Sequence, residues 1–168
     1  KPHKAYEDLL AAAAEVTRKD PRTLFVAVGE GPSRPELEAR HAALGLDDRF
    51  RFLGYRPDAT RLLSGFDLFC LSSRHEGLPL ALMEALVLGV PSVVTNVGGN
   101  SELVTDGIEG LLLPPSRPNL LATALLDLAG DSLRRSAMAA AASKRGDTLR
   151  ADDATARIEA HYRRLLGR

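Results

Sequence analysis

Short apolar segments alternate with helical segments along the chain, and this alternation constrains the fold more than any other feature. Strands are predicted for the segments Leu24–Val28, Arg51–Leu53, Asp67–Leu71, Ser92–Thr95 and Leu111–Leu113. Helices are predicted for the segments His3–Arg18, Ser33–Leu44, Asp58–Ser64, Pro79–Leu88, Asn100–Val104, Asn119–Ala129, Ser132–Lys144 and Asp153–Leu166, with a polar loop at Arg145–Asp153. Strands separated by helices form parallel sheets that are covered on both faces. We therefore expect an α/β, Rossmann-like, doubly wound sheet flanked by helices, in a single domain over residues 1–168.

Composition excludes several classes of function. Lys and Arg together number 22, as do Asp and Glu, so the formal charge is zero and argues against a general nucleic-acid or membrane-surface role. The single cysteine, Cys70, leaves no internal disulfide partner and fits a reducing compartment. No signal peptide and no apolar run of membrane-spanning length is found in the sequence. The expected location is the cytoplasm, with peripheral attachment to the inner face of the membrane as an alternative.

The segment Leu78–Val90 is apolar apart from Glu84, and a second carboxylate, Glu76, precedes it in a loop with Gly77. A helix that is apolar on every side is expected to be buried, and a carboxylate inside it needs a partner. Two interpretations stay open for each acid: Glu84 binds a ligand or pairs with a core group, and Glu76 is functional or an exposed loop residue.

Several of these features are expected at one edge of the sheet. Ligands of doubly wound folds bind at the carboxyl ends of the strands, where the Glu76 loop, the Gly54 turn and the Gly98-Gly99 turn would lie. Backbone N–H groups at a helix N-terminus favour anions and could hold a diphosphate. A carboxylate such as Glu84 accepts hydrogen bonds, and a ribose diol offers two donors. The pattern indicates an anionic, hydroxyl-rich ligand such as a sugar nucleotide.

An ordered series of motifs carries a family resemblance: Val28-Gly29-Glu30-Gly31-Pro32, Phe52-Leu53-Gly54-Tyr55, Ser73-Arg74-His75-Glu76-Gly77-Leu78-Pro79, Glu84-Ala85, Gly89-Val90-Pro91 and Gly98-Gly99-Asn100-Ser101-Glu102-Leu103-Val104. The series closely resembles the donor-binding motif of the retaining GT-B glycosyltransferases of family four. That family's signature is two glutamates separated by seven residues, as Glu76 and Glu84 are here. The resemblance implies the C-terminal, donor-binding half of a GT-B fold.

The resemblance also implies roles for individual residues. Glu76 would lie against the transferred sugar, and Lys4 would neutralise the diphosphate as the second catalytic residue. Glu84 would bind the ribose hydroxyls. Two backbone amides, those of Gly77 and Leu78, would face the donor sugar and phosphates. The turn with Tyr55 and Arg56 would border the base, with Arg56 as the expected determinant of its selection.

Taken for the whole enzyme, the resemblance implies transfer of a sugar from a UDP-, GDP- or ADP-sugar with retention of configuration. No metal or other cofactor is expected, and no convincing Asp-x-Asp motif is found in the sequence. The family's arginine five residues before the lysine, its first strand and its acceptor-binding N-terminal domain fall before Lys1. The donor-binding half is expected to be inactive alone, with unpaired sheet edges. The helix at 153–166 is expected to pack on the N-terminal domain through Ile158, Tyr162 and Leu165.

Other functions compete with this interpretation. A non-catalytic sugar-nucleotide-binding or interaction module is one, and another GT-B enzyme, such as a sugar-nucleotide epimerase or a phosphorylase, is a second. The segment Gly29–Arg34 begins like a dinucleotide fingerprint, but Arg34 replaces its last glycine, and a structural turn is favoured. The pair Ser72-Ser73 lacks a nucleophile elbow. His75 could move protons or simply line the rim of the site.

Overall fold

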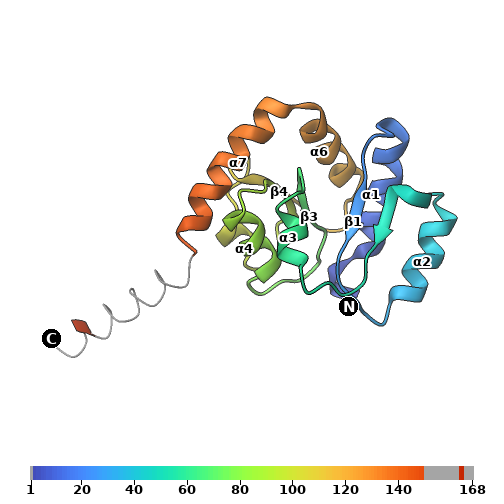
Figure 1. Cartoon of the computed structure of the whole chain (residues 1–168), viewed down its shortest axis with the longest axis horizontal. Coiled ribbons are helices and arrows are strands. Elements are labelled where there is room, and N and C mark those ends of the chain that lie inside the picture. The colour runs from blue at the N-terminus through green and yellow to red at the C-terminus, as the bar shows by residue number, and fades with distance from the viewer. Residues whose placement is uncertain (1, 150–162, 165–168) are drawn as a thin grey trace.

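The computed structural model describes residues 2–149 and 163–164 (Figure 1). Its elements follow in the order η1 (Pro2–Lys4), α1 (Tyr6–Lys19), β1 (Phe25–Ala27), α2 (Arg34–Ala43), η2 (Asp47–Arg49), β2 (Phe50–Phe52), α3 (Ala59–Leu63), β3 (Phe69–Leu71), α4 (Leu80–Val87), β4 (Ser92–Thr95), α5 (Asn100–Leu103), β5 (Gly110–Leu113), α6 (Pro118–Gly130) and α7 (Ser132–Asp147). The predicted alternation of strands and helices is confirmed. The predicted helix at Asp153–Leu166 lies outside the described residues, apart from Arg163 and Arg164.

The parallel strands form two sheets, where the sequence predicted one. In the first sheet β1 pairs with β2, and Val26 is in register with Arg51. In the second sheet β4 lies between β3 and β5, and Val93 is in register with Cys70 and Leu111. All the pairings are parallel. Within the described residues β1 and β3 do not pair, so each presents one unpaired edge.

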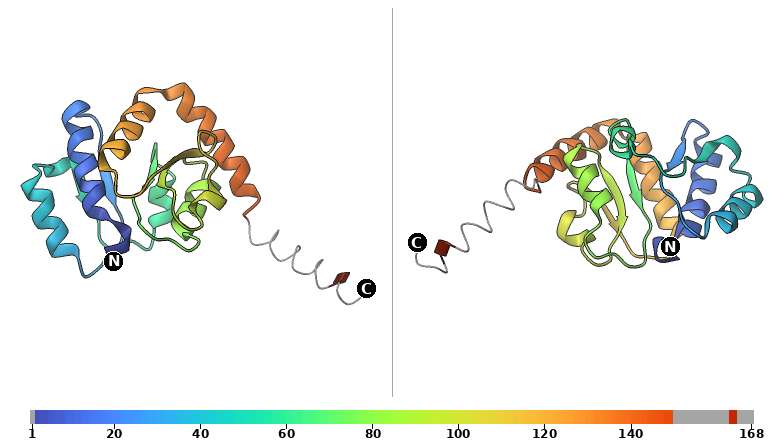
Figure 2. Two further views of the ribbon diagram at one scale, coloured as in Figure 1. Left: turned by 180° about the vertical axis from the view of Figure 1, so that it is seen from behind. Right: turned by 60° about the horizontal axis from the view of Figure 1, so that its bottom comes forward.

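Helices cover both faces of the second sheet, as its side chains show. Successive strand residues point to opposite faces. Val93 belongs to a cluster with residues of α1, α6 and the first half of α7, whereas Val94 belongs to a cluster with residues of α4, α5 and the second half of α7. Every residue of β4 is buried. Figure 2 shows α1, α2 and the first sheet on one side of the molecule and α4 and α7 on the other.

Two predicted helix boundaries are wrong. The N-terminal helix was expected from His3, but Ala5 has a left-handed φ of 48°, so the turn η1 ends at Lys4 and α1 begins at Tyr6. The segment after Lys144 was expected to be a loop, but α7 continues to Asp147. Close packing explains this extension, because an added Cβ at Gly146 would lie 2.5 Å from the carbonyl oxygen of Leu86 in α4.

Helix α4 is not buried on every side, which corrects a further prediction. Its inner face carries Leu82, Ala85 and Leu86, which are buried, whereas Leu80 is 74% exposed. Glu84 lies on the exposed face as well. The sequence could not show this, because apolar residues on all sides of a helix do not reveal which face meets the sheet.

Candidate functional site

Two glycines bring the loops after β3 and β4 into direct contact. An added Cβ at Gly98 would lie 1.7 Å from the carbonyl oxygen of Glu76, and one at Gly99 would lie 2.3 Å from that of Gly77. The Gly99 N–H donates to the Gly77 carbonyl at 2.8 Å. The structure therefore confirms that the Glu76 loop and the Gly98-Gly99 turn share the carboxyl edge of the sheet, and only glycine fits at these two positions.

The two residues predicted to be catalytic form an ion pair. Lys4 Nζ donates to Glu76 Oε1 at 2.7 Å, and the Glu76 side chain is only 7% exposed. Ser73 Oγ donates to the same oxygen at 2.5 Å. Because both donors use Oε1, neither of them uses the second oxygen of this carboxylate.

Ser73 was not expected to be a site residue, yet it belongs to a buried polar network beneath Glu76. Its side chain is fully buried, and its carbonyl accepts a hydrogen bond from Thr95 Oγ1 at 2.6 Å. The Thr95 carbonyl in turn accepts from Asn100 Nδ2 at 2.8 Å. The signal that sequence analysis missed is a polar residue at the end of a buried strand, three positions before an acid. These hydrogen bonds tie the loop after β3 to the end of β4 and to α5, while Asn100 Oδ1 is buried without a partner among the described residues.

The loop after β3 is also fastened to the N-terminal segment. Ser72 Oγ donates to the carbonyls of Lys4 and Ala5 at 3.0 and 3.1 Å, and the Arg74 N–H donates to the His3 carbonyl at 2.7 Å. These bonds position Lys4 next to Glu76.

Arg74 ties the same loop to the first turn of α1. Its guanidinium pairs with Glu7 at 2.7 Å and with Asp8 at 3.1 Å. The charge of Asp8 and the hydrogen bond to Glu7 raise the pKa of Arg74. The loop that carries Glu76 is therefore held from three sides, by Lys4, by α1 and by the glycine turn.

The N-terminus of α4 opens toward this edge. The residue before the helix is Pro79, and no side chain caps the first turn. The first N–H groups of a helix lack partners within the helix and carry partial positive charge, so an uncapped first turn suits an anion. Gly77 and Leu78 are exposed in the preceding loop. Glu84, one turn into the helix, lines a large cavity together with Lys4.

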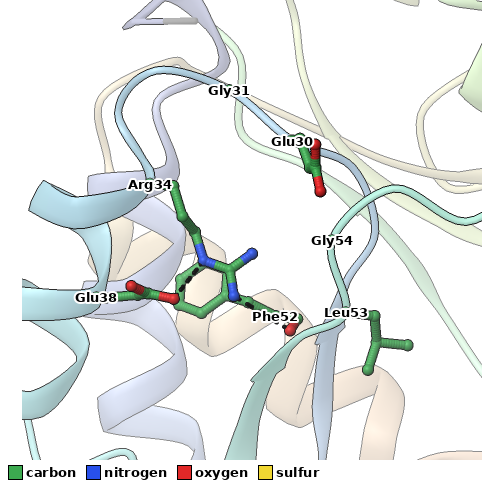
Figure 3. Close-up of a pocket in the computed structure, with 7 residues that line it drawn as sticks. All are labelled: Glu30, Gly31, Arg34, Glu38, Phe52, Leu53 and Gly54. Atoms are coloured by element: carbon green, nitrogen blue, oxygen red, sulfur yellow. Dashed lines mark hydrogen bonds and ion pairs between the residues drawn. The ribbon is translucent and has the colours of Figure 1, made fainter.

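A smaller cavity of about 720 Å³ lies beside the segment that resembles a dinucleotide fingerprint (Figure 3). Arg34 fills one of its walls: Nε donates to Glu38 at 2.5 Å, and the guanidinium carbon lies 4.6 Å from the centre of the Phe52 ring. Figure 3 shows Glu30 beside Gly54, where an added Cβ would lie 3.2 Å from Glu30 Oε1. Arg34 is thus engaged within the fold at the position where the fingerprint has glycine.

The predicted base-binding residues lie in the loop after β2. Tyr55 is 72% exposed. Arg56 donates to both carboxylate oxygens of Asp58 at 2.8 Å, and this hydrogen bonding raises the pKa of Arg56. Neither side chain lines the two cavities described above, although the adjoining Gly54 lines the smaller one. Their contact with a base stays a prediction.

The described residues include neither a metal-binding cluster nor a membrane-spanning helix. Among residues 2–149 and 163–164, no group of three or more His, Cys, Asp or Glu side chains is arranged to hold a metal ion. No helix in the described part of the chain is long and apolar enough to cross a membrane.

Parallel strands, helices on both faces and an acid-bearing loop at the carboxyl edge define the Rossmann-like class of α/β domain found in GT-B glycosyltransferases. The chain belongs to the family described as glycosyl transferases group 1, whose family model matches residues 1–145.

Named relatives agree with this assignment. The chain is 36% identical over 138 residues to alpha-D-kanosaminyltransferase of Streptomyces kanamyceticus, a match that covers 81% of this chain and 36% of that enzyme. The structure superposes on HepE of Anabaena in complex with UDP with a TM-score of 0.86, at 28% identity, over 99% of this chain and 46% of HepE. It also matches the C-terminal domain of the group 1 glycosyltransferase LpcC of Francisella tularensis, with a TM-score of 0.79 and 26% identity, over 88% of this chain and 80% of that domain. The chain thus spans about a third of the kanosaminyltransferase and under half of HepE.

Proposed function

We propose that the chain is the donor-binding half of a glycosyltransferase that moves a sugar from a nucleoside-diphosphate sugar to an acceptor. The observation that carries this proposal is the Lys4–Glu76 ion pair, which lies at the same edge as the uncapped N-terminus of α4. Relatives that are named as glycosyltransferases and a neighbour that is solved with UDP support it.

The two positive groups of this edge match the charge that develops during transfer. Cleavage of the anomeric bond releases a nucleoside diphosphate, so negative charge grows on the β-phosphate. Lys4 and the first N–H groups of α4 would stabilise that charge, and a single fixed donor of this kind contributes about 3–4 kcal/mol. Because these groups are already cationic or dipolar, we propose that the reaction needs no metal.

Glu76 would act on the sugar itself. Its carboxylate is held through Oε1 by Lys4 and Ser73. The other oxygen would accept a hydrogen bond from a hydroxyl of the donor sugar. Lys4 would turn from Glu76 toward the diphosphate when the donor binds, since both acceptors compete for the same ammonium group. Retention of configuration is proposed from the family resemblance.

Calorimetric titration of the chain with UDP, GDP and ADP tests the donor site. We expect one nucleotide to bind, and the Glu84→Ala variant to bind it at least about tenfold more weakly, because hydrogen bonds to a charged group contribute about 1.5–3 kcal/mol each. Glu36→Ala, which removes an exposed carboxylate from α2, is the matched control and should bind as the parent chain does. Equal affinity of the Glu84→Ala variant and the parent chain would refute the ribose contact. If the folded chain bound none of the three nucleotides, the donor-site proposal would fail for this chain.

A further inference from the structure

Two consecutive serines follow β3, and each of them holds one member of the Lys4–Glu76 ion pair. Ser73 donates to the Glu76 carboxylate at 2.5 Å. Ser72 holds the lysine side instead: its Oγ lies 3.0 Å from the Lys4 carbonyl oxygen and 3.1 Å from that of Ala5. Because Ser72 is only 4% exposed, water has little access to this hydroxyl.

The backbone that Ser72 holds is strained at Ala5. This residue is fully buried and left-handed, with φ 48° and ψ 44°. For alanine this conformation is disfavoured in population by about 5–30-fold. A residue of this kind keeps its conformation only where its surroundings fix it. The Ala5 carbonyl accepts from the N–H groups of Asp8 and Leu9 at 3.0 and 3.3 Å, and from Ser72, so the first turn of α1 and the Ser72 hydroxyl together fix the strained residue.

Lys4 directly precedes this strained residue, so the dihedral angles of Ala5 decide where Lys4 lies relative to α1. We propose that Ser72 is a positioning residue: its hydroxyl keeps Ala5 left-handed and thereby aims the Lys4 ammonium at the donor site. This inference rests on the proposed function, in which Lys4 stabilises the β-phosphate. The Arg74 N–H anchors His3, the residue before Lys4, whereas Ser72 anchors Lys4 itself and the residue after it.

Loss of the Ser72 hydroxyl has a defined consequence. A serine hydroxyl supplies one donor, and alanine supplies none. The carbonyls of Lys4 and Ala5 would lose that donor, and Ala5 would relax from its left-handed conformation. Since α1 is fixed by its packing on α6, the relaxation would move Lys4 and draw its ammonium away from Glu76.

Chemical modification of lysines in the ligand-free chain tests this role. Acetylation of Lys4 is measured by mass spectrometry relative to Lys19, which pairs with Glu15 at 2.7 Å and serves as a reference within the same molecule. An ammonium held against a buried carboxylate is less accessible to the reagent than a released one. Ser72→Ala should therefore raise the ratio of Lys4 to Lys19 modification at least about threefold, as the loss of one hydrogen bond allows.

Two further variants separate this role from general damage to the fold. Ser92→Ala is the matched control, because Ser92 is also fully buried and donates to a backbone carbonyl, that of Val90, at 3.3 Å; it should leave the ratio unchanged. Ser72→Ala combined with Ala5→Gly should return the ratio to that of the parent chain, because glycine adopts left-handed backbone without a steric cost. A ratio that stays raised in the double variant would contradict the argument from strain.

Nucleotide binding gives a second readout, at the donor site itself. In calorimetric titration, Ser72→Ala should weaken the binding of the nucleoside diphosphate at least about threefold and leave that of the corresponding monophosphate unchanged, because Lys4 acts on the β-phosphate. A general structural defect would weaken both nucleotides alike. If the parent chain bound no nucleotide, the donor-site proposal would fail, while the lysine ratio would still decide the role of Ser72.

Three results would overturn the inference. They are an unchanged lysine ratio in a folded Ser72→Ala chain, an equal rise of that ratio in Ser92→Ala, and equal weakening of diphosphate and monophosphate binding. If Ser72→Ala does not fold, the double variant with Ala5→Gly decides. Restored folding would support the role of the hydroxyl in holding the strained residue, and a double variant that stays unfolded would contradict it.

Discussion

Replacing Gly98 by alanine should displace the loop that carries Glu76. The added Cβ would lie 1.7 Å from the Glu76 carbonyl oxygen, so the two loops must separate by roughly 1.5 Å to restore ordinary contact. Gly98 has a left-handed φ of 51°, which costs alanine about 1–2 kcal/mol, and overpacking adds about 1–3 kcal/mol. We expect a loss of about 2–5 kcal/mol in the free energy of unfolding.

Gly107→Ala is the matched control for this prediction. Gly107 also has a left-handed φ, of 80°, but an added Cβ there would meet no atom within 4 Å. Gly107→Ala should therefore lower the free energy of unfolding only through its left-handed backbone conformation, by about 1–2 kcal/mol. Urea unfolding measures both variants, and calorimetric titration with the nucleotide that the parent chain binds should show weakened binding for Gly98→Ala only. Equal losses of stability in the two variants would refute the argument from loop contact.

Three further predictions concern other parts of the molecule. Burial raises the pKa of the Cys70 thiol to about 12, from the ordinary value of 9.0. The folded state therefore keeps this proton at pH values where the unfolded chain loses it. The stability linked to the thiol is complete below pH 9 and is lost as the pH rises toward 12. Relative to Cys70→Ala, the parent chain should therefore lose about 1.4 kcal/mol per pH unit in this window, as alkaline urea titrations would show. Gly146→Ala should destabilise the packing of α7 on α4 by about 1–3 kcal/mol, whereas Gly130→Ala, with open space around it, should be neutral or stabilising, and thermal unfolding would measure both. Ser73→Ala should weaken the binding of the donor sugar nucleotide, measured by calorimetry, but not that of the corresponding free nucleoside diphosphate, because its hydroxyl holds the Glu76 carboxylate. An equal loss for both ligands would contradict that role.

Periodicity and glycine positions predicted the elements of this fold well. Each predicted strand is present, although β1 and β3 are two residues shorter than expected. The strand β4 has the bounds that were predicted for it, Ser92–Thr95, and all four of its residues are buried. Helix ends were harder to predict, since the left-handed Ala5 has no signature in the sequence. The division into two sheets depends on which strands lie adjacent in space, and a single strand pattern does not contain that information.

The candidate site was predicted in part, for a similar reason. The family resemblance singled out Glu76 and Lys4, and the structure brings the two side chains into contact at 2.7 Å, while their roles stay a prediction. The burial of Glu84 was predicted wrongly, because its helix packs only one face on the sheet. Ser73 was missed because its role arises from a contact with a residue three positions away at the end of a strand. The salt bridge from Arg56 to Asp58 was not predicted either, since it forms within a local turn.

The bonds between the N-terminal segment and the loop after β3 have a mechanical consequence. His3 and Lys4 are joined to Arg74, Ser72 and Glu76 by hydrogen bonds and an ion pair, so a displacement of either segment would strain or break its bonds to the other. Any force that is applied to the polypeptide at Pro2 acts on the Glu76 carboxylate within a few bonds, without passing through the sheet.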